Sequence, residues 1–333
     1  MAGLKNVRTD LTLEAHELLK EQSLKEGGGQ ADIPGVMVEN AGDDDIQITR
    51  VRVTTPAGEK AIGKPMGNYI TLEIPGLRDN DQELYENTCK ALAKELSSIL
   101  KLNEKTMTLV VGLGNWNVTP DALGPKVVSS MMVTRHLLEY LPDQVDDGVR
   151  PVCAVAPGVL GITGIETGEI VKGIVDRIKP DYVIAIDALA SRKMDRVNTT
   201  IQIADTGISP GSGVGNKRME LSRATLGIPV IAIGVPTVVD AATMANDTID
   251  LVLDSMIEQA PKGTEFYNMM KSIDRDEKYG MIQEVLEPYV GNLIVTPKEI
   301  DEVVRKVAKA IANGLNIALH QGITLNDVNR YVN

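Results

Sequence analysis

The stretch Met107–Pro125, MTLVVGLGNWNVTPDALGP, combines an apolar run, a glycine-containing turn and the beginning of a helix. Residues 108–111 predict a buried strand. The pair Thr119-Pro120 then predicts a helix N-terminus, with threonine as the N-cap and proline at the first helical position. Asp121 is therefore expected near the carboxyl end of a strand, where ligands and catalytic groups collect in open α/β sheets. An acid in the first helical turn also complements the helix dipole, so Asp121 alone does not indicate a function.

A second apolar segment ends in the same way. Residues 182–186 predict a strand, and Asp187 follows directly. If the two strands are parallel neighbours, Asp121 and Asp187 point into one crevice. Two such carboxylates can share a proton or hold a metal ion. The sequence leaves open whether the strands are adjacent.

The composition of the 333-residue chain excludes several classes of protein. A net charge of −12 disfavours binding to nucleic acid, because the chain would repel a phosphate backbone. Aromatic residues make up only 3% of the chain, so the core is expected to be aliphatic. The two cysteines, Cys89 and Cys153, imply no disulfide framework. No apolar run approaches the roughly 20 residues that span a bilayer, so we expect a cytoplasmic protein without a membrane segment.

The order of predicted elements indicates an α/β fold. Strands and helices alternate from residue 107 to residue 233, which predicts a mostly parallel central sheet flanked by helices, as in phosphorylase-like and hydrolase-like folds. Strands at 36–38, 46–53 and 69–74 predict a small antiparallel N-terminal part. Helices are expected at 11–25, 81–102, 122–140, 166–178 and near the C-terminus from 296. We expect one domain at 11–333, with residues 11–105 as the helix and antiparallel strands and 106–333 as the sheet core and C-terminal helix.

Three short motifs resemble known catalytic or nucleotide sites but depart from them. Ser209 stands in a G-x-S-x-G string, yet Pro210 lacks the backbone N–H that an oxyanion hole requires after the nucleophile. Residues 211–218 resemble a P-loop but have Asn and Arg beside the lysine. Gly112-Leu113-Gly114 is half of a dinucleotide fingerprint. We therefore predict no cofactor and treat the glycine loops as candidate substrate or active-site loops: Gly112, Gly114, Asn115, Gly211, Gly213, Gly215, Asn216, Lys217 and Arg218.

Several long segments resemble the germination protease family of spore-forming bacteria, enzymes that degrade small acid-soluble spore proteins and are similar in fold to hydrogenase-maturation endopeptidases. The segments are VRTDLTLEA (Val7–Ala15), VVGLGNWNVTPDALGPK (Val110–Lys126), PGVLGITGIET (Pro157–Thr167), AIDALASR (Ala185–Arg192), the block Ser209–Ala241 and VTPKEID near the end. The resemblance implies that Asp121 and Asp187 carry peptide hydrolysis. It leaves open whether they act as an aspartate dyad or hold a metal. We expect no stably bound metal, because the histidine ligand of the maturation enzymes has no counterpart here.

The resemblance also implies a zymogen that removes its own N-terminus. Residues 1–10 would be a propeptide arm, and Asp10-Leu11 the scissile bond. It further implies a homotetramer in the developing and germinating spore core, with small acid-soluble spore proteins as substrates whose degradation it initiates. Residues 259–279 look shorter than in longer relatives, and we transfer no role to them.

Two other classes of function remain as alternatives. A nucleotide-cofactor-binding oxidoreductase of doubly wound fold would respond to a titration with NAD. A non-enzymatic spore protein would cleave no spore protein under any condition.

Overall fold

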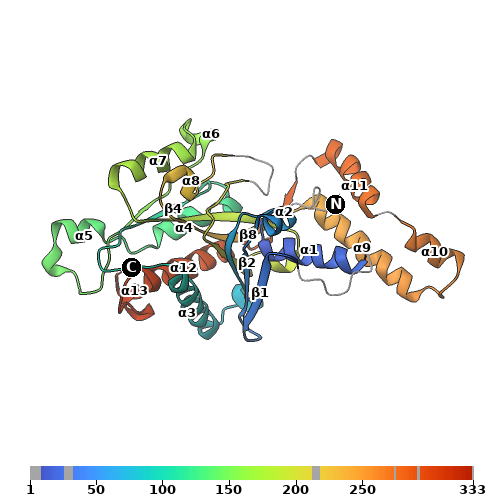
Figure 1. Cartoon of the computed structure of the whole chain (residues 1–333), viewed down its shortest axis with the longest axis horizontal. Coiled ribbons are helices and arrows are strands. Elements are labelled where there is room, and N and C mark those ends of the chain that lie inside the picture. Colours follow the sequence, from blue (N-terminus) through green and yellow to red (C-terminus); the bar gives the residue numbers. More distant parts are fainter. Residues whose placement is uncertain (1–8, 26–32, 212–217, 274, 291–292, 332–333) are drawn as a thin grey trace.

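A nine-stranded sheet forms the centre of the molecule (Figure 1). The computed structural model describes residues 9–25, 33–211, 218–273, 275–290 and 293–331. Within these ranges the strand order is β1-β2-β3-β7-β8-β6-β4-β5, and β9 pairs with β8. The strands are β1 Val36–Gly42, β2 Gln47–Val53, β3 Gly67–Glu73, β4 Thr108–Gly112, β5 Val152–Val155, β6 Tyr182–Ser191, β7 Thr200–Ala204, β8 Val230–Asp240 and β9 Ile294–Val295.

Helices cover both faces of this sheet. The α-helices are α1 Thr12–Lys25, α2 Pro56–Ile62, α3 Gln82–Ile99, α4 Leu123–Ser129, α5 Arg135–Tyr140, α6 Leu160–Thr163, α7 Thr167–Ile178, α8 Arg223–Leu226, α9 Ala241–Gln259, α10 Glu265–Lys271, α11 Arg275–Val290, α12 Ile300–Leu319 and α13 Leu325–Tyr331. Short 3-10 turns are η1 Pro75–Arg78, η2 Thr119–Asp121, η3 Pro142–Gln144 and η4 Met194–Arg196. The predicted α/β fold with flanking helices is confirmed.

The sheet is mixed, and the prediction of a mostly parallel sheet is not confirmed. Strands β8, β6, β4 and β5 run parallel to one another, whereas β1, β2, β3 and β7 pair antiparallel along the other half. The antiparallel N-terminal strands extend the central sheet through the pairing of β3 with β7. The direction of β7 follows from the short connection after β6, because a parallel return requires a crossover of a dozen or more residues.

Alternating side chains give the sheet two buried faces. Val110 of β4 packs into the larger core with α3, α4 and α12, whereas its neighbours Leu109 and Val111 face a second core with α7 and α8. Figure 1 shows α3 and α12 on one side of the sheet and α7 and α8 on the other. Successive strand residues point to opposite faces, so a strand buried on both sides reads as a continuous apolar run.

The single helix predicted at 122–140 is wrong. Two helices, α4 and α5, stand in its place, separated by residues 130–134. Tertiary hydrogen bonds hold this break: the Met132 N–H donates to Asn316 Oδ1 at 3.0 Å, and the Val152 N–H donates to Thr134 Oγ1 at 3.0 Å. A prediction from helical periodicity uses only neighbouring residues, so it cannot take account of hydrogen-bond partners such as Asn316, which lies far away in the sequence.

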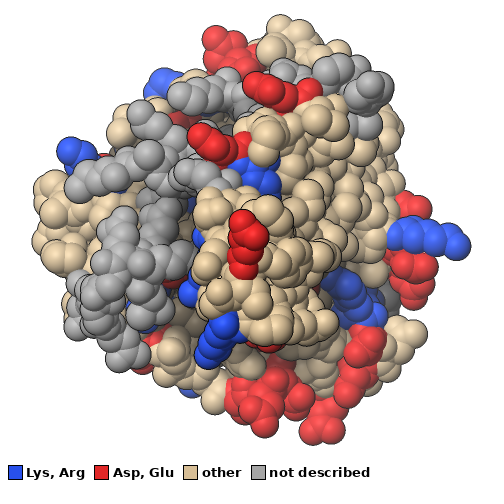
Figure 2. All heavy atoms as spheres, turned by 90° about the vertical axis from the view of Figure 1, so that its right-hand side faces the viewer, with Lys and Arg blue, Asp and Glu red and all other residues tan. Residues whose placement is uncertain are grey.

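Helices α9, α10 and α11 extend beyond the edge of the sheet, on the right of Figure 1. Many of their apolar side chains are exposed: Ile249, Leu251, Val252, Met256, Phe266, Met269, Met281 and Val285. Figure 2 shows this end of the molecule, with broad uncharged areas between separate acidic and basic side chains. None of the helices in the described ranges has the length and apolar character needed to cross a bilayer.

Candidate active site

The turn after β4 positions Asp121. At Gly114 the backbone has φ +108°, and a Cβ there would lie 2.0 Å from the Asp121 carbonyl oxygen, so only glycine fits. The Thr237 hydroxyl donates a 2.7 Å hydrogen bond to the Pro120 carbonyl, and the Asn115 N–H donates to Asp121 Oδ2 at 2.8 Å. The turn that carries Asp121 is the 3-10 helix η2. The hydrogen bond from Thr237 fixes this turn to β8.

Asp187 lies within the neighbouring parallel strand. Gly112 of β4 pairs with Ile186 of β6, so the two strands are adjacent, a point that the sequence had left open. The sequence predicted that the strand ends before Asp187, and this end is wrong. The strand continues to Ser191, because its pairing with β8 extends that far through a bulge. Asp187 is only 5% exposed, and the Ala188 N–H donates to its Oδ1 at 3.0 Å.

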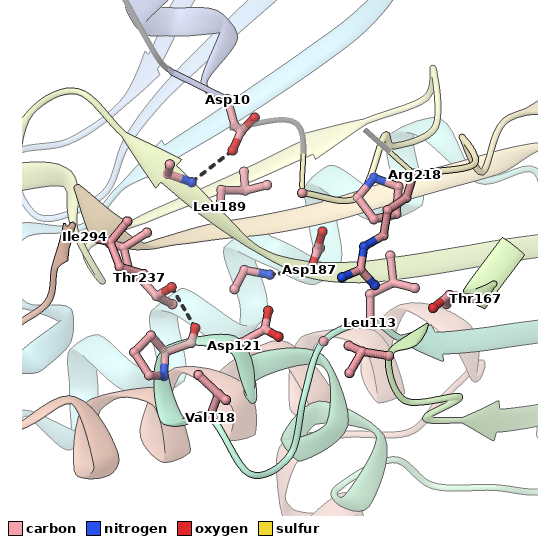
Figure 3. Close-up of a pocket in the computed structure, with 18 residues that line it drawn as sticks. Asp10, Leu113, Val118, Asp121, Thr167, Asp187, Leu189, Arg218, Thr237 and Ile294 are labelled. Carbon is pink, nitrogen blue, oxygen red and sulfur yellow. Dashed lines mark hydrogen bonds between the residues drawn. The ribbon is translucent and has the colours of Figure 1, made fainter. Parts of the chain in front are cut away.

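Burial raises the pKa values of both carboxyl groups. For Asp121, burial is the main cause, and the Asn115 N–H and Arg218 oppose it. For Asp187, burial, then the charges of Asp121 and Asp10, raise the pKa well above its ordinary value. Figure 3 shows the Arg218 side chain directed toward the acidic pair. Of the two carboxyl groups, Asp187 therefore has the stronger tendency to keep a proton.

Two cavities of about 270 Å³ each are lined by Asp187. The first also contains Asp121, Arg218 and Thr237, and the second contains Lys64 and Gln202. The cavities share five residues: Asp10, Asp187, Ala188, Leu189 and Gly211. The buried carboxyl group of Asp187 is thus in the wall of both cavities.

The predicted scissile bond begins at Asp10, which lines both cavities. The Asp10 N–H donates to the Ala190 carbonyl at 3.0 Å. The Ala190 N–H donates back to Asp10 Oδ2 at 2.9 Å, and Figure 3 marks this bond with a dashed line. The carbonyl oxygen of Asp10 accepts a hydrogen bond from Lys64 Nζ at 2.9 Å. Leu11 is fully buried, and its N–H donates to Thr9 Oγ1 at 3.1 Å. The bond between residues 10 and 11 is therefore held at both its oxygen and its nitrogen.

The structure describes nine of the predicted site residues and brings six of them together. The predicted residues that line the first cavity are Asp10, Gly114, Asp121, Asp187, Gly211 and Arg218. Gly112 instead packs against the backbone of Gly124, which a Cβ would approach to 2.2 Å. Since the protein's own backbone occupies this space, the glycine pair does not support a dinucleotide site. Gly213, Gly215, Asn216 and Lys217 lie outside the described residues.

Two polar residues beside Asp10 were not identified from the sequence. Gln202 is buried in the otherwise apolar strand β7, and a buried polar side chain within an apolar strand is a signal that could have identified it. Lys64 stands in the loop between α2 and β3, where nothing in the local sequence distinguishes it from a surface lysine.

No group of three or more His, Cys, Asp or Glu side chains in the described ranges is arranged to hold a metal ion. The expectation of a site without a stably bound metal stays a prediction.

A mixed α/β fold with two carboxyl groups of raised pKa in one crevice, beside a held peptide bond, is suited to acid–base hydrolysis. The chain belongs to the germination protease family, whose model matches residues 12–265 and 254–332. It is therefore a peptidase, and the resemblance noted from the sequence is confirmed.

Curated germination proteases are similar to the chain over nearly its whole length. That of Clostridium tetani is 57% identical over 328 residues, covering 98% of this chain and 100% of the relative. That of Caldanaerobacter subterraneus is 55% identical, covering 97% of each chain. That of Bacillus cereus is 46% identical, covering 98% of this chain and 97% of the relative. The two matched ranges overlap at residues 254–265, which reach into the segment 259–279 that was predicted to be shorter than in longer relatives.

Proposed function

We propose that the protein is an endopeptidase that initiates degradation of small acid-soluble spore proteins during germination, and that it is made as a zymogen cleaved by itself between Asp10 and Leu11. The observation that carries this proposal is the position of Asp10, which lines the same two cavities as Asp187. Residues 1–10 would form the propeptide arm and residues 11–333 the protease domain.

The acidic pair is proposed to act as an aspartate dyad. Asp121, whose charged form is favoured by the Asn115 N–H, would take a proton from water as the water oxygen attacks the Asp10 carbonyl carbon. Asp187, protonated because of its burial, would give its proton to the leaving nitrogen of Leu11. The C–N bond then breaks, and the products are a carboxylate at residue 10 and an amine at residue 11.

The assembled enzyme is proposed to be a homotetramer in the spore core. The apolar side chains exposed on α9–α11 support self-association, because an apolar patch of this kind is a typical protein–protein contact surface. The net charge of −12 disfavours direct binding to nucleic acid, so the proposed partners are the substrate proteins and other copies of the chain.

Substitution of each carboxyl group tests the proposal. Asp121→Asn and Asp187→Asn should each lower self-processing and substrate cleavage by about 10³-fold or more, because each removes one proton-transfer group. Circular dichroism should show an unchanged fold. Ser209→Ala is the matched control and should keep wild-type activity, since Pro210 denies Ser209 an oxyanion donor.

Wild-type rates in either Asn variant would place the catalytic groups elsewhere. Metal content of the active enzyme, measured by mass spectrometry, separates the two mechanisms. One equivalent of metal that is required for activity would contradict the metal-free dyad.

A further inference from the structure

Two side chains donate hydrogen bonds to the carbonyl oxygen of the proposed scissile bond. Lys64 Nζ lies 2.9 Å from the Asp10 oxygen, and Gln202 Nε2 lies 3.4 Å from the same atom. The Gln202 Oε1 accepts a 2.7 Å hydrogen bond from the Thr12 N–H on the other side of that bond. One amide group thus contacts the backbone both before and after the bond.

The sheet register places Gln202 and Asp187 in one row. Gln202 of β7 pairs with Gly234 of β8, and Gly234 pairs with Asp187 of β6. Residues aligned across neighbouring strands point to the same face of a sheet, and strands lie roughly 4.8 Å apart. Gln202 and Asp187 therefore flank a glycine on one face, roughly 10 Å apart between their Cα atoms, and both line the second cavity.

We propose that Lys64 and Gln202 are catalytic residues of self-cleavage, which stabilise the negative charge that develops on the Asp10 carbonyl oxygen. The proposal rests on the proposed function, since it takes Asp10-Leu11 as the scissile bond. As water adds to the carbonyl carbon, the electron pair of the C=O bond moves onto the oxygen. The charge returns to the C=O bond when the C–N bond breaks and Leu11 leaves as an amine.

The chemistry of Lys64 suits this task. Burial lowers the pKa of its ammonium group, while Asp10 and Glu14 oppose that effect. A partly desolvated cation interacts more strongly with a developing anion than an exposed one does, because water screens less of the charge. Its Nζ already donates a 2.9 Å hydrogen bond to the carbonyl oxygen on which the negative charge would develop. The hydrogen bond from Gln202 Nε2 is longer, at 3.4 Å, and would reach full strength only as the Asp10 carbonyl oxygen moves toward it.

A simpler role, in which Lys64 only anchors the arm, makes a different prediction. Asp10 has a separate anchor, the pair of hydrogen bonds with Ala190. An oxyanion role therefore predicts that loss of Lys64 slows cleavage while Asp10 stays in place. An anchoring role predicts that the arm leaves the site.

The experiment uses the full-length chain with three variants. Lys64→Met removes the charge, Lys64→Arg restores a cation, and Gln202→Glu keeps the acceptor for the Thr12 N–H but loses the donor. Lys306→Met is the matched control, because Lys306 Nζ also donates to a backbone carbonyl, that of Arg78 at 3.4 Å, away from the site. The first-order rate of self-processing is measured for each variant. Hydrogen exchange of the Asp10 and Ala190 amides is measured in an Asp187→Asn background, in which the arm stays uncleaved.

We expect Lys64→Met to lower the processing rate by about 10²-fold, with partial recovery in Lys64→Arg, a smaller loss in Gln202→Glu and no change in Lys306→Met. Amide protection of Asp10 and Ala190 should stay as in the parent. A processing rate in Lys64→Met equal to wild type, or loss of amide protection together with slower processing, would overturn the inference. Absence of self-cleavage at Asp10-Leu11 in the wild-type chain would instead contradict the proposed function.

Discussion

Asp187 combines two conditions that disfavour a charged carboxyl group. It is 5% exposed, and the negative charge of Asp121 adds to the effect of burial in raising its pKa. When the pH is below the ordinary pKa of an aspartate, Asp187 is protonated in both the folded and the unfolded chain. When the pH is above that value, the unfolded chain releases the proton more readily than the folded chain does. The free energy of unfolding therefore falls as the pH rises toward the pKa of Asp187 in the folded chain.

Replacing this group by a neutral isostere is therefore expected to stabilise the fold. Asp187→Asn should raise the melting temperature at pH 7.5, and the gain should shrink at pH 4.5, because the carboxyl group is then closer to fully protonated in both states. Differential scanning calorimetry at the two pH values measures this. Asp44→Asn, at an exposed position, is the control and should show no such pH-dependent gain. A melting temperature that falls at pH 7.5 in Asp187→Asn would show that the charged form is stabilised in the fold.

The sequence singled out Asp121, Asp187 and several residues near them, such as Arg218, but not Lys64 or Gln202. Asp121 and Asp187 each follow an apolar strand segment in the sequence, a local pattern that predicts a position at one sheet edge. Lys64 and Gln202 reach Asp10 only through contacts between residues far apart in the chain. Their role depends on the pairing of β3 with β7, which no local pattern specifies.

At the level of elements, the turn between β4 and η2 depends on Gly114. Its φ of +108° disfavours any residue with a Cβ, and a Cβ there would collide with the Asp121 carbonyl oxygen. Gly114→Ala should destabilise the chain by more than the roughly 1–2 kcal/mol typical of a non-glycine residue at positive φ. It should also abolish cleavage, because the turn that carries Asp121 has to shift.

Gly227→Ala separates these two effects. Gly227 ends α8 with φ +80°, and no atom lies within 4 Å of the position that its Cβ would take. Its replacement should destabilise by about 1–2 kcal/mol and leave cleavage intact. Urea unfolding and a peptidase assay measure the two properties. Full activity in Gly114→Ala would show that the turn tolerates the shift and that its geometry is not required.

The elements themselves were predicted to differing degrees. The predicted strand segments were confirmed. They could be predicted because a short apolar run bounded by turns is a local signal in the sequence. The direction of β7 and the break between α4 and α5 were not predicted. The break depends on Asn316 and on the backbone of Val152, which lie far away in the sequence. Long-range hydrogen bonds of this kind override local propensity.

At the scale of the whole molecule, helix α1 connects the arm to the protease. Arg196 of η4 holds α1 through Glu17, with Nη2–Oε1 at 2.6 Å, and through Glu14, with Nη1–Oε1 at 3.5 Å. Both acids lie after the proposed cleavage site. Helix α1 is therefore expected to stay docked when residues 1–10 are removed, while Asp10 leaves the two cavities that it lines.

A chain whose first residue is Leu11, released from a cleavable fusion, should cleave small acid-soluble spore proteins without any processing step. This follows from the proposal that the arm is a tethered substrate, whose high effective concentration would exclude other peptides until it is cut. The full-length chain should process itself faster at mildly acidic pH, because the acidic pair keeps its shared proton only below its upper apparent pKa. Cleavage of a purified spore protein, followed by electrophoresis, measures both.

The shortened chain with Asp187→Asn is the control and should be inactive, which separates arm removal from the chemistry. Its melting temperature reports whether α1 is still docked, since loss of the buried contacts of Leu11 and Glu14 would lower it. If the shortened chain is fully folded and still as inactive as the full-length chain, inhibition by the arm is contradicted. The protease would then be restrained by a different part of the molecule, and occupation of the cavities by Asp10 would be incidental.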